Sequence, residues 1–529
     1  MNETGYWPEF NQSFLPVLDE AFATHAEREC IVYGTVRLSY AEVDRASRAI
    51  ARRLTAEGFE PGMRGAVYSL NSHTSFIATL GIVRAGGVWI PVNARNAPEE
   101  NRAILNRYGC DALFFQQAWA EIVEAIETPT ARLTLRVSLD APERGELDYS
   151  AWATGDAGPL SVPREGTDLF TLPLTGGTTG LPKAVMLSHR NFNALCHGMT
   201  ERYGDRRVTI LCAAPMTHVG GRIAVCSLKA GARFVIIDRV DPGLILELIE
   251  RERITDFFLP PTGVYALLDH PRLDETDLSS LHSLSYGSAP MSLPRLKEAL
   301  QRIGPVMTGG LGQTESPMFI ARLQPEEHYS GDPADGVLAP DAILTSVGRN
   351  TALSELAIVD DDANPLPPGS TGEVAVRGPM VSEGYYENPE ATAEIRRNGW
   401  HLTGDIGVID EKGYLRIVDR KKDMIITGGF NVYSSEVEAV LHTLPNVALS
   451  VVVGAPSDKW GEEVVAVIVP APGTTPDADE IIAACKEKLG GVKAPKRIQF
   501  VDELPRTPIG KIDKKAVRAP FWTDAGRQV

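Results

Sequence analysis

The chain has 529 residues, of which 43% are hydrophobic and 23% charged, and its formal net charge is −17. This composition is typical of a folded globular protein, and the length predicts two or more domains. The negative charge argues against general affinity for nucleic acid or an anionic membrane, because both need a basic surface.

The N-terminal segment MNETGYWPEFNQSF lacks a basic region followed by an apolar one, and no apolar run is long enough to span a bilayer. The six cysteines form no C-x-x-C pair and no zinc-like spacing with histidine. They predict reduced, mostly buried thiols. We therefore expect a cytoplasmic protein with no integral membrane segment.

Residues 94–115 and 241–261 each combine a helical hydrophobic period with a short apolar run. Residues 278–315 continue this pattern, and their apolar runs end in glycine-rich turns. Such alternation predicts αβ units around a largely parallel sheet, in which ligands bind at the carboxyl ends of the strands.

The pattern changes to shorter elements after about residue 345. Residues 355–379 predict two strands joined by a Pro/Gly/Asp turn. Residues 424–457 predict a strand, a glycine turn, a helix opened by a capping box of Ser435 and Glu438, and another strand. We expect an α/β fold with a large N-terminal domain of αβ-layered sheets (1–419), joined by a hinge to a small α+β C-terminal domain (420–529).

The segment LTGGTTGLPK (174–183) is unusually rich in glycine and threonine. If it connects a strand to a helix, its N–H groups and hydroxyls suit a phosphate, and Lys183 adds positive charge. It is not a Walker A loop, because Leu181-Pro182 separate Gly180 from Lys183 and Ala184 follows the lysine. Gly510-Lys511 fails the same pattern because Ile512 follows it.

This loop resembles the signature T-[SG]-G-[ST]-T-G-x-P-K of the ANL superfamily, which includes acyl-CoA synthetases, peptide-synthetase adenylation domains and firefly luciferase. Further motifs of that superfamily occur in the expected order along nearly the whole chain. They are GGVWIPVN (86–93), PMTHVGG (215–221), YGSAP (286–290), GLGQTES (310–316), TGEVAVRGPMVSEGYY (371–386), GWHLTGD (399–405), YLRIVDRKKDMIITGGFNVYSSEVE (414–438) and LPRTPIGKIDK (504–514).

The superfamily includes long-chain fatty-acid–CoA ligases, and the resemblance to it implies a reaction for this chain. Members activate a carboxylic acid with ATP and Mg²⁺ to an acyl-adenylate, release pyrophosphate, and mostly transfer the acyl group to coenzyme A. Negative charge at the α-phosphorus calls for cations and fixed donors. Rotation of the C-terminal domain, here about Lys422, separates the two steps.

The resemblance also implies which residues bind the nucleotide and coenzyme A. Asp405 corresponds to the carboxylate that accepts both ribose hydroxyls, and Arg420 to the arginine that reaches the ribose or a phosphate. Leu311 stands where an aromatic ring usually packs on the adenine. The remaining candidates line the phosphate loop, the adenine slot and the pantetheine path: Thr175, Gly176, Gly177, Thr178, Thr179, Gly180 and Lys183; Gly287, Ser288, Ala289, Gly312 and Gln313; Gly428 and Gly429. Outside the motifs, such threonines, glycines and basic runs also fit ordinary turns and solvated surfaces.

Four residues are implied in catalysis. Lys511 would bridge the carboxylate and the α-phosphate, Thr314 would contact that phosphate, Glu315 would hold Mg²⁺, and His218 would orient the acid. The acyl pocket would include Gly220, Gly221, Arg222, Gly309 and Gly310. Its glycines suggest room for a bulky acyl group, and Arg222 either meets a second polar group of the acid or turns to solvent.

Alternative functions stay open at this point. Met216-Thr217 replace the aspartate of amino-acid-activating relatives, which favours an acid without an α-amine. The acceptor could be a carrier protein rather than coenzyme A, and an inactive nucleotide-binding homologue or a luciferase-like oxygenase are further alternatives. Homodimers occur in the family, and the sequence leaves the oligomeric state open.

Overall fold

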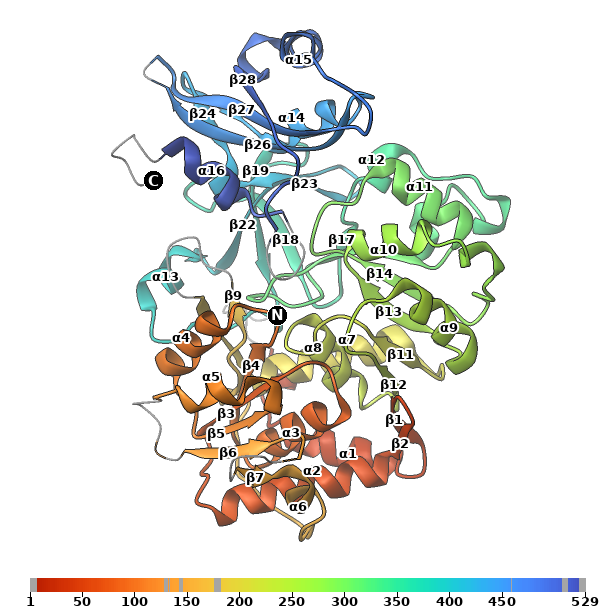
Figure 1. Cartoon of the computed structure of the whole chain (residues 1–529), viewed down its shortest axis with the longest axis vertical. Coiled ribbons are helices and arrows are strands. Elements are labelled where there is room, and N and C mark those ends of the chain that lie inside the picture. The colour runs from red at the N-terminus through yellow and green to blue at the C-terminus, as the bar shows by residue number, and fades with distance from the viewer. Residues whose placement is uncertain are drawn as a thin grey trace. The chain divides into compact units, whose positions relative to one another are not determined.

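The computed structural model describes residues 7–127, 132, 134–141, 146–175, 182–457, 459–506 and 512–522. The chain divides into two compact units (Figure 1). Unit 1 comprises residues 1–356 and 376–401, and unit 2 comprises residues 357–375 and 402–529. The domain boundary predicted at 419/420 falls inside unit 2, and strands β18, β19 and β22 each carry residues of both units.

Unit 1 contains two large sheets. The first has the strand order β17-β16-β15-β14-β13-β11-β12-β1-β2, and β15 to β1 are joined in parallel. Its strands are β1 (Glu29–Tyr33), β2 (Val36–Ser39), β11 (Thr209–Cys212), β12 (Arg233–Ile236), β13 (Asp256–Leu259), β14 (Ser283–Tyr286), β15 (Met307–Leu311), β16 (Ala321–Leu323) and β17 (Arg349–Asn350).

The second sheet has the order β20-β10-β8-β4-β3-β5-β6-β7, with β9 paired to β10. Its strands are β3 (Arg64–Ser69), β4 (Val88–Asn93), β5 (Ala112–Phe115), β6 (Leu135–Ser138), β7 (Leu147–Asp148), β8 (Leu169–Thr171), β9 (Leu174–Thr175), β10 (Lys183–Ser188) and β20 (Gly384–Tyr385).

Helices cover both faces of these sheets. They are α1 (Leu15–Thr24), α2 (Tyr40–Ala56), α3 (His73–Arg84), α4 (Pro98–Tyr108), α5 (Ala120–Glu124), α6 (Tyr149–Ala153), α7 (His189–Tyr203), α8 (Val219–Ser227), α9 (Pro242–Glu252), α10 (Pro261–Leu268), α11 (Leu293–Arg302), α12 (Asp341–Leu344) and α13 (Pro389–Glu394). Alternate strand residues face opposite layers: Val67 packs in the core with α2 and α3, whereas Tyr68 packs in the core with α4 and α5. This layering confirms the predicted α/β class.

Unit 2 is built around a smaller sheet of order β25-β24-β27-β26, with β28 beside β27. The elements that lie wholly in unit 2 are β23 (Leu415–Arg420), β24 (Ile425–Thr427), β25 (Phe430–Val432), α14 (Ser434–Leu441), β26 (Val447–Ser457), β27 (Gly461–Pro470), α15 (Ala478–Lys493), β28 (Arg497–Phe500) and α16 (Lys514–Trp522). The strands shared with unit 1 are β18 (Glu355–Val359), β19 (Thr371–Arg377) and β22 (Trp400–Ile409), and β21 (Arg396–Arg397) pairs with β22.

The structure corrects one prediction about α14. The expected capping box of Ser435 and Glu438 is wrong, because the helix begins at Ser434 and both side chains have other partners. Ser435 donates its hydroxyl proton to the Val418 carbonyl oxygen, and Glu438 lies 2.9 Å from the Lys514 ammonium. Tertiary contacts therefore use the two groups that the local pattern assigned to the helix end.

The six cysteines are buried and free of disulfides, as predicted. Within the described ranges, no helix combines the length and the apolar character needed to cross a bilayer.

Candidate active site

The glycine- and threonine-rich loop connects two antiparallel strands. Thr175 ends β9, Lys183 begins β10, and these two residues pair across the strands. The Thr175 hydroxyl donates to the Lys183 carbonyl oxygen at 3.4 Å. The expected strand-to-helix connection is therefore wrong, since α7 begins only at His189. Gly176, Gly177, Thr178, Thr179 and Gly180 lie outside the described residues.

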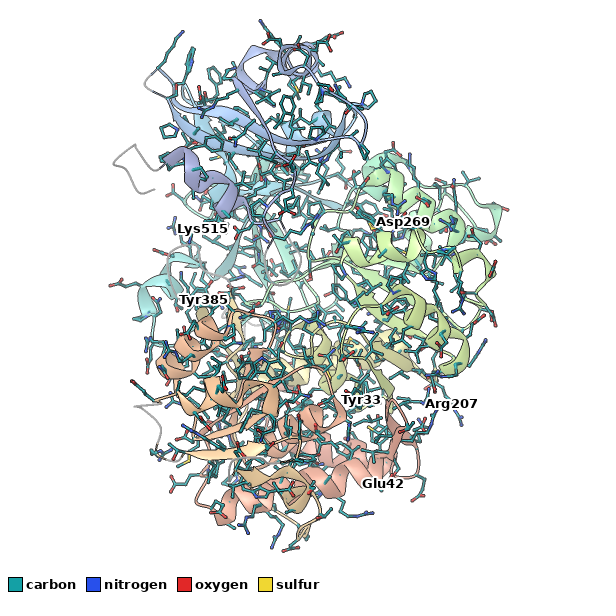
Figure 2. The ribbon with its side chains drawn as sticks, in the orientation of Figure 1. Tyr33, Glu42, Arg207, Asp269, Tyr385 and Lys515 are labelled. Atoms are coloured by element: carbon teal, nitrogen blue, oxygen red, sulfur yellow. The ribbon has the colours of Figure 1, made fainter. Side chains whose placement is uncertain are left out.

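Tyr385 of β20, which is labelled in Figure 2, links two predicted site residues, a role that its motif alone does not indicate. Its hydroxyl donates to Glu315 Oε1 at 2.6 Å, and the Lys183 ammonium lies 4.9 Å from the centre of its ring. Burial and the negative charge of Glu315 raise the pKa of the Tyr385 hydroxyl. The hydroxyl therefore stays protonated at neutral pH and acts as a fixed donor to the carboxylate.

Glu315 belongs to the segment that follows β15, and the backbone around it is held in place. Its carbonyl oxygen accepts a hydrogen bond from the Ser382 N–H at 2.8 Å. The preceding Gln313 N–H donates to the Ser316 carbonyl oxygen at 3.0 Å, and the Gln313 amide oxygen lies 3.5 Å from His401 Nε2. Thr314 and Glu315 are therefore carried on a loop anchored at both ends.

The predicted adenine segments follow the carboxyl ends of two neighbouring parallel strands. Gly287, Ser288 and Ala289 come directly after β14, and Gly312 and Gln313 follow β15. Ser288 has a φ of +67°, a conformation that non-glycine residues seldom adopt. Leu311, at the end of β15, is half-buried. This is the sheet edge at which open α/β sheets collect their ligands.

Helix α8 carries the predicted acyl-pocket residues. His218 occupies the N-cap position of this helix, and its Nδ1 lies 3.2 Å from the Thr217 hydroxyl oxygen. A Cβ at Gly220 would lie 2.6 Å from the Ala214 carbonyl oxygen, and one at Gly221 would lie 1.9 Å from the Met216 carbonyl oxygen. These glycines allow close backbone packing and do not leave free volume, so that part of the reasoning for a bulky acyl group is wrong.

Helix α8, which carries expected acyl-pocket residues, borders a small cavity together with strand β14. Gly220 and Ile223 of α8, together with Ser285 of β14, line a cavity of about 20 Å³. Gly309 and Gly310 lie on β15, beside β14, and a Cβ at Gly309 would meet the Tyr286 hydroxyl at 2.9 Å. Arg222 is 8% exposed, so the expectation that it turns to solvent is wrong.

The site residues predicted in the C-terminal part lie in unit 2. Asp405 of β22 and Arg420 of β23 are cross-strand partners, and Arg420 Nε lies 2.8 Å from Asp405 Oδ1. Gly428 and Gly429 form the turn between β24 and β25, with φ values of +58° and +82°. Lys422 lies in a short 3₁₀ turn (Lys421–Asp423), and Lys511 is outside the described residues.

Glu315 fits a role as a magnesium ligand. A carboxylate has about four acceptor positions, so the hydrogen bond from Tyr385 leaves acceptor positions for a metal. Mg²⁺ typically takes one or two protein carboxylates and completes its octahedron with water and substrate phosphates. Among the residues that the structure describes, no three His, Cys, Asp or Glu side chains converge on one point, so a metal here would need such additional ligands.

The fold and these residues define a two-unit protein with the motifs of adenylate-forming enzymes. Residues 18–386 match the family model described as AMP-binding enzyme, and residues 436–511 match the AMP-binding enzyme C-terminal domain. A feruloyl-CoA synthase from Amycolatopsis sp is 36% identical over 518 residues, which cover 96% of this chain and 98% of the relative.

Two further comparisons also place the chain among enzymes of this family. A medium/long-chain-fatty-acid–CoA ligase from Mycobacterium tuberculosis is 35% identical over 528 residues, covering 96% of this chain and 90% of the relative. The solved structure of an amide bond synthetase from Marinactinospora thermotolerans superposes with a TM-score of 0.85 at 32% identity, over 96% of this chain and 99% of that one. The chain belongs to the AMP-binding enzyme family, within the ANL superfamily.

Proposed function

We propose that this protein is an AMP-forming acid–thiol ligase, which activates a carboxylic acid with ATP and transfers the acyl group to coenzyme A. Support comes from the family match across both parts of the chain and from the named CoA ligases among its relatives. The observation that carries the proposal is the Glu315–Tyr385–Lys183 cluster, which joins three segments far apart in sequence.

The cluster suits phosphate chemistry. Lys183 supplies a cation for the β- and γ-phosphates, and Thr175 and the loop residues up to Gly180 supply donors. Thr314 contacts the α-phosphate. Glu315 would hold Mg²⁺, which would supply positive charge to neutralise the charge that develops on the phosphate oxygens. Tyr385 fixes the Glu315 carboxylate, so little reorganisation is needed when substrate binds.

The remaining predicted residues bind the rest of the substrates. Asp405 and Arg420 hold the ribose, because a buried carboxylate offers acceptors to two hydroxyls and its ion pair with Arg420 fixes its orientation. His218 orients the acid, and Lys511 bridges the acid and the α-phosphate. Gly429, where an added Cβ would contact no atom of the described residues within 4 Å, leaves room for the pantetheine arm, whereas Gly428 packs on Trp460. Lys422 is the hinge between the two half-reactions. The free thiols favour the cytoplasm, a reducing compartment.

The test is pyrophosphate release with MgATP over a panel of aliphatic, aromatic and dicarboxylic acids, with and without coenzyme A. We expect release with at least one acid and thioester formation when coenzyme A is present. Glu315→Gln should reduce release by more than about a hundredfold. Glu326→Gln, which changes an exposed glutamate, is the matched control. No release with any acid would contradict the proposal, and release without thioester would favour a carrier-protein acceptor.

A further inference from the structure

Glu373 is a buried carboxylate whose two oxygens hold the residues next to the predicted ribose-binding pair. It lies on β19 and is 8% exposed. Its Oε1 accepts a hydrogen bond from the Gly404 N–H at 3.0 Å, and its Oε2 lies 2.9 Å from the Lys421 ammonium. Gly404 directly precedes Asp405, and Lys421 directly follows Arg420. All of these residues belong to unit 2.

The backbone just before Asp405 departs from regular strand geometry and is held by β19. Gly404 has a φ of +71° inside β22, in the left-handed region that favours glycine, and its N–H donates to the Glu373 carboxylate. The Asp405 N–H donates to the Thr403 hydroxyl oxygen at 3.1 Å, and that hydroxyl donates to the Val374 carbonyl oxygen at 2.8 Å. Two neighbouring residues of β19 therefore fix the direction in which the Asp405 side chain leaves its strand.

The second oxygen of Glu373 acts on Arg420, the partner of Asp405. The Arg420 side chain is 49% exposed, so its ion pair with Asp405 orders it only weakly by itself. Lys421, the next residue, is bound by Glu373 and also lies 3.4 Å from Asp361, whose side chain is 99% exposed. The buried carboxylate is the stronger partner of this lysine, because solvent screens the exposed one. Glu373 therefore fixes the backbone from which Arg420 extends.

Stability of the sheet gives little reason for a carboxylate at this buried position. Desolvation offsets much of the attraction within a buried ion pair, and apolar residues of similar volume often stabilise a protein equally well. The two bonds of Glu373 instead determine where two backbone segments lie, one on β22 and one on β23. A binding site needs such support, because its side chains must be held close to the geometry that the ligand requires.

We propose that Glu373 is a positioning residue for the nucleotide, which sets the geometry of Asp405 and Arg420 so that the Asp405 carboxylate meets both ribose hydroxyls. This inference rests on the proposed function, in which Asp405 binds the ribose. Glu373 acts through these two residues and not on the phosphates. Its loss should therefore change how well the enzyme distinguishes a ribonucleotide from the analogues that lack one ribose hydroxyl.

The experiment measures the affinities of AMP, 2′-deoxyAMP and 3′-deoxyAMP by calorimetry, which requires no knowledge of the acid. The unmodified enzyme should bind AMP about tenfold to a hundredfold more tightly than either analogue, because each analogue lacks a hydroxyl that bonds to a charged group. Glu373→Met removes both acceptors at similar volume. It should bring both affinity ratios below about threefold, because a displaced Asp405 carboxylate no longer distinguishes the hydroxyls.

Three further variants separate the two bonds of Glu373. Glu373→Gln keeps an acceptor for the Gly404 N–H but loses the charge that attracts Lys421, so it should retain part of the preference for AMP. Lys421→Met removes the ammonium alone and should have a similar effect. Asp361→Asn changes the exposed partner of the same lysine, and its affinity ratios should equal those of the unmodified enzyme. If Glu373→Met does not fold, the ratios of Glu373→Gln and Lys421→Met decide.

Unchanged affinity ratios in Glu373→Met would overturn the proposal, whether all three nucleotides bind less tightly or only the melting temperature falls. Glu373 would then stabilise unit 2 without a role at the ribose. Equal affinity of the unmodified enzyme for AMP and both analogues would also overturn it, because Asp405 would then not bind the hydroxyls. Failure of the proposed function is a separate result, since it is seen as absence of pyrophosphate release with every acid.

Discussion

Tyr385 is the residue whose role depends most on contacts that the sequence does not show. Its motif, EGYY, was recognisable, but the pattern does not say which side chain the tyrosine meets. The structure puts its hydroxyl 2.6 Å from Glu315 Oε1, across 70 residues of sequence. A hydrogen bond to a charged group contributes roughly 1.5–3 kcal/mol, which is enough to decide how a metal-binding carboxylate is oriented.

Tyr385→Phe removes this hydrogen bond while keeping the ring under Lys183. We expect pyrophosphate release to fall about tenfold to a hundredfold, with weaker apparent affinity for Mg²⁺, because the Glu315 carboxylate loses its fixed donor. Titration of the rate with magnesium measures this effect. Tyr386→Phe is the control on the neighbouring tyrosine. A rate that falls without any change in magnesium dependence would count against a positioning role.

His189 couples the stability of unit 1 to pH. It begins α7 at 1% exposure, and its Nδ1 accepts a hydrogen bond from the Phe14 N–H at 3.1 Å. Burial, reinforced by the charge of Arg164, lowers the pKa of this histidine to about 4. Since an unfolded histidine has a pKa near 6.5, its stabilisation is present above that value and is lost as pH falls towards 4.

We expect the free energy of unfolding to drop by about 2–3 kcal/mol between pH 7 and pH 4 through this group alone. His189→Gln can still accept the Phe14 hydrogen bond but does not titrate, so its stability should depend less steeply on pH in that window. Urea unfolding at several pH values measures the slope. His282→Gln, at an exposed histidine, should leave the slope unchanged; an equal slope in the His189 variant would refute the assignment.

At the scale of elements, local patterns predicted the αβ units better than the connections between them. The helix and strand expected in residues 94–115 are α4 and β5, and those in 241–261 are α9 and β13. The strand-to-helix connection expected around the glycine-rich loop and the capping box at Ser435 were both wrong. The pairing of β9 with β10 determines the first connection, and side-chain contacts to distant residues determine the start of α14. The residues next to each place in the sequence do not show these interactions.

Helix α16, which follows the predicted catalytic residue Lys511 in sequence, is held by contacts with residues far away in the chain. Lys514 starts this helix three residues after Lys511, and its ammonium lies 2.7 Å from the Ser434 hydroxyl and 2.9 Å from a Glu438 oxygen. Asp419 accepts a hydrogen bond from the same Ser434 hydroxyl at 2.9 Å. Burial opposes the charge of Lys514, but the neighbouring carboxylates outweigh it and raise its pKa.

Lys514→Met should destabilise unit 2 by about 1.5–3 kcal/mol, because it removes a charge-assisted hydrogen bond to the Glu438 carboxylate, which is 17% exposed. Adding Glu438→Gln should restore a large part of that loss, since the unpaired charge is then removed. Thermal and urea unfolding measure both effects. Lys515→Met, at the exposed neighbour labelled in Figure 2, is the control and should stay within about 0.5 kcal/mol. Equal losses in the single and double variants would show that the ion pair is not the cause.

For the whole molecule, the ordered motifs predicted the family, and both family models match the chain. The motifs could not predict how the chain divides. Residues 357–375 and 402–419 pack with the C-terminal residues, so Asp405 and Arg420 share one unit and one cross-strand ion pair. A linear boundary at residue 419 separates these partners in sequence, whereas hydrogen bonding between β22 and β23 keeps them together.

The last prediction concerns the two half-reactions and uses two variants with opposite expected effects. Lys511→Ala should reduce adenylate formation by roughly a hundredfold or more, because a charge at the reacting oxygens is lost, while thioester formation from supplied acyl-adenylate stays within about threefold. Lys422→Pro restricts the backbone at the proposed hinge, so it should spare pyrophosphate exchange and slow thioester formation. Separate assays of the two steps measure this division. If both steps fell together in both variants, a single arrangement of the chain would serve both chemistries and the hinge would have no role.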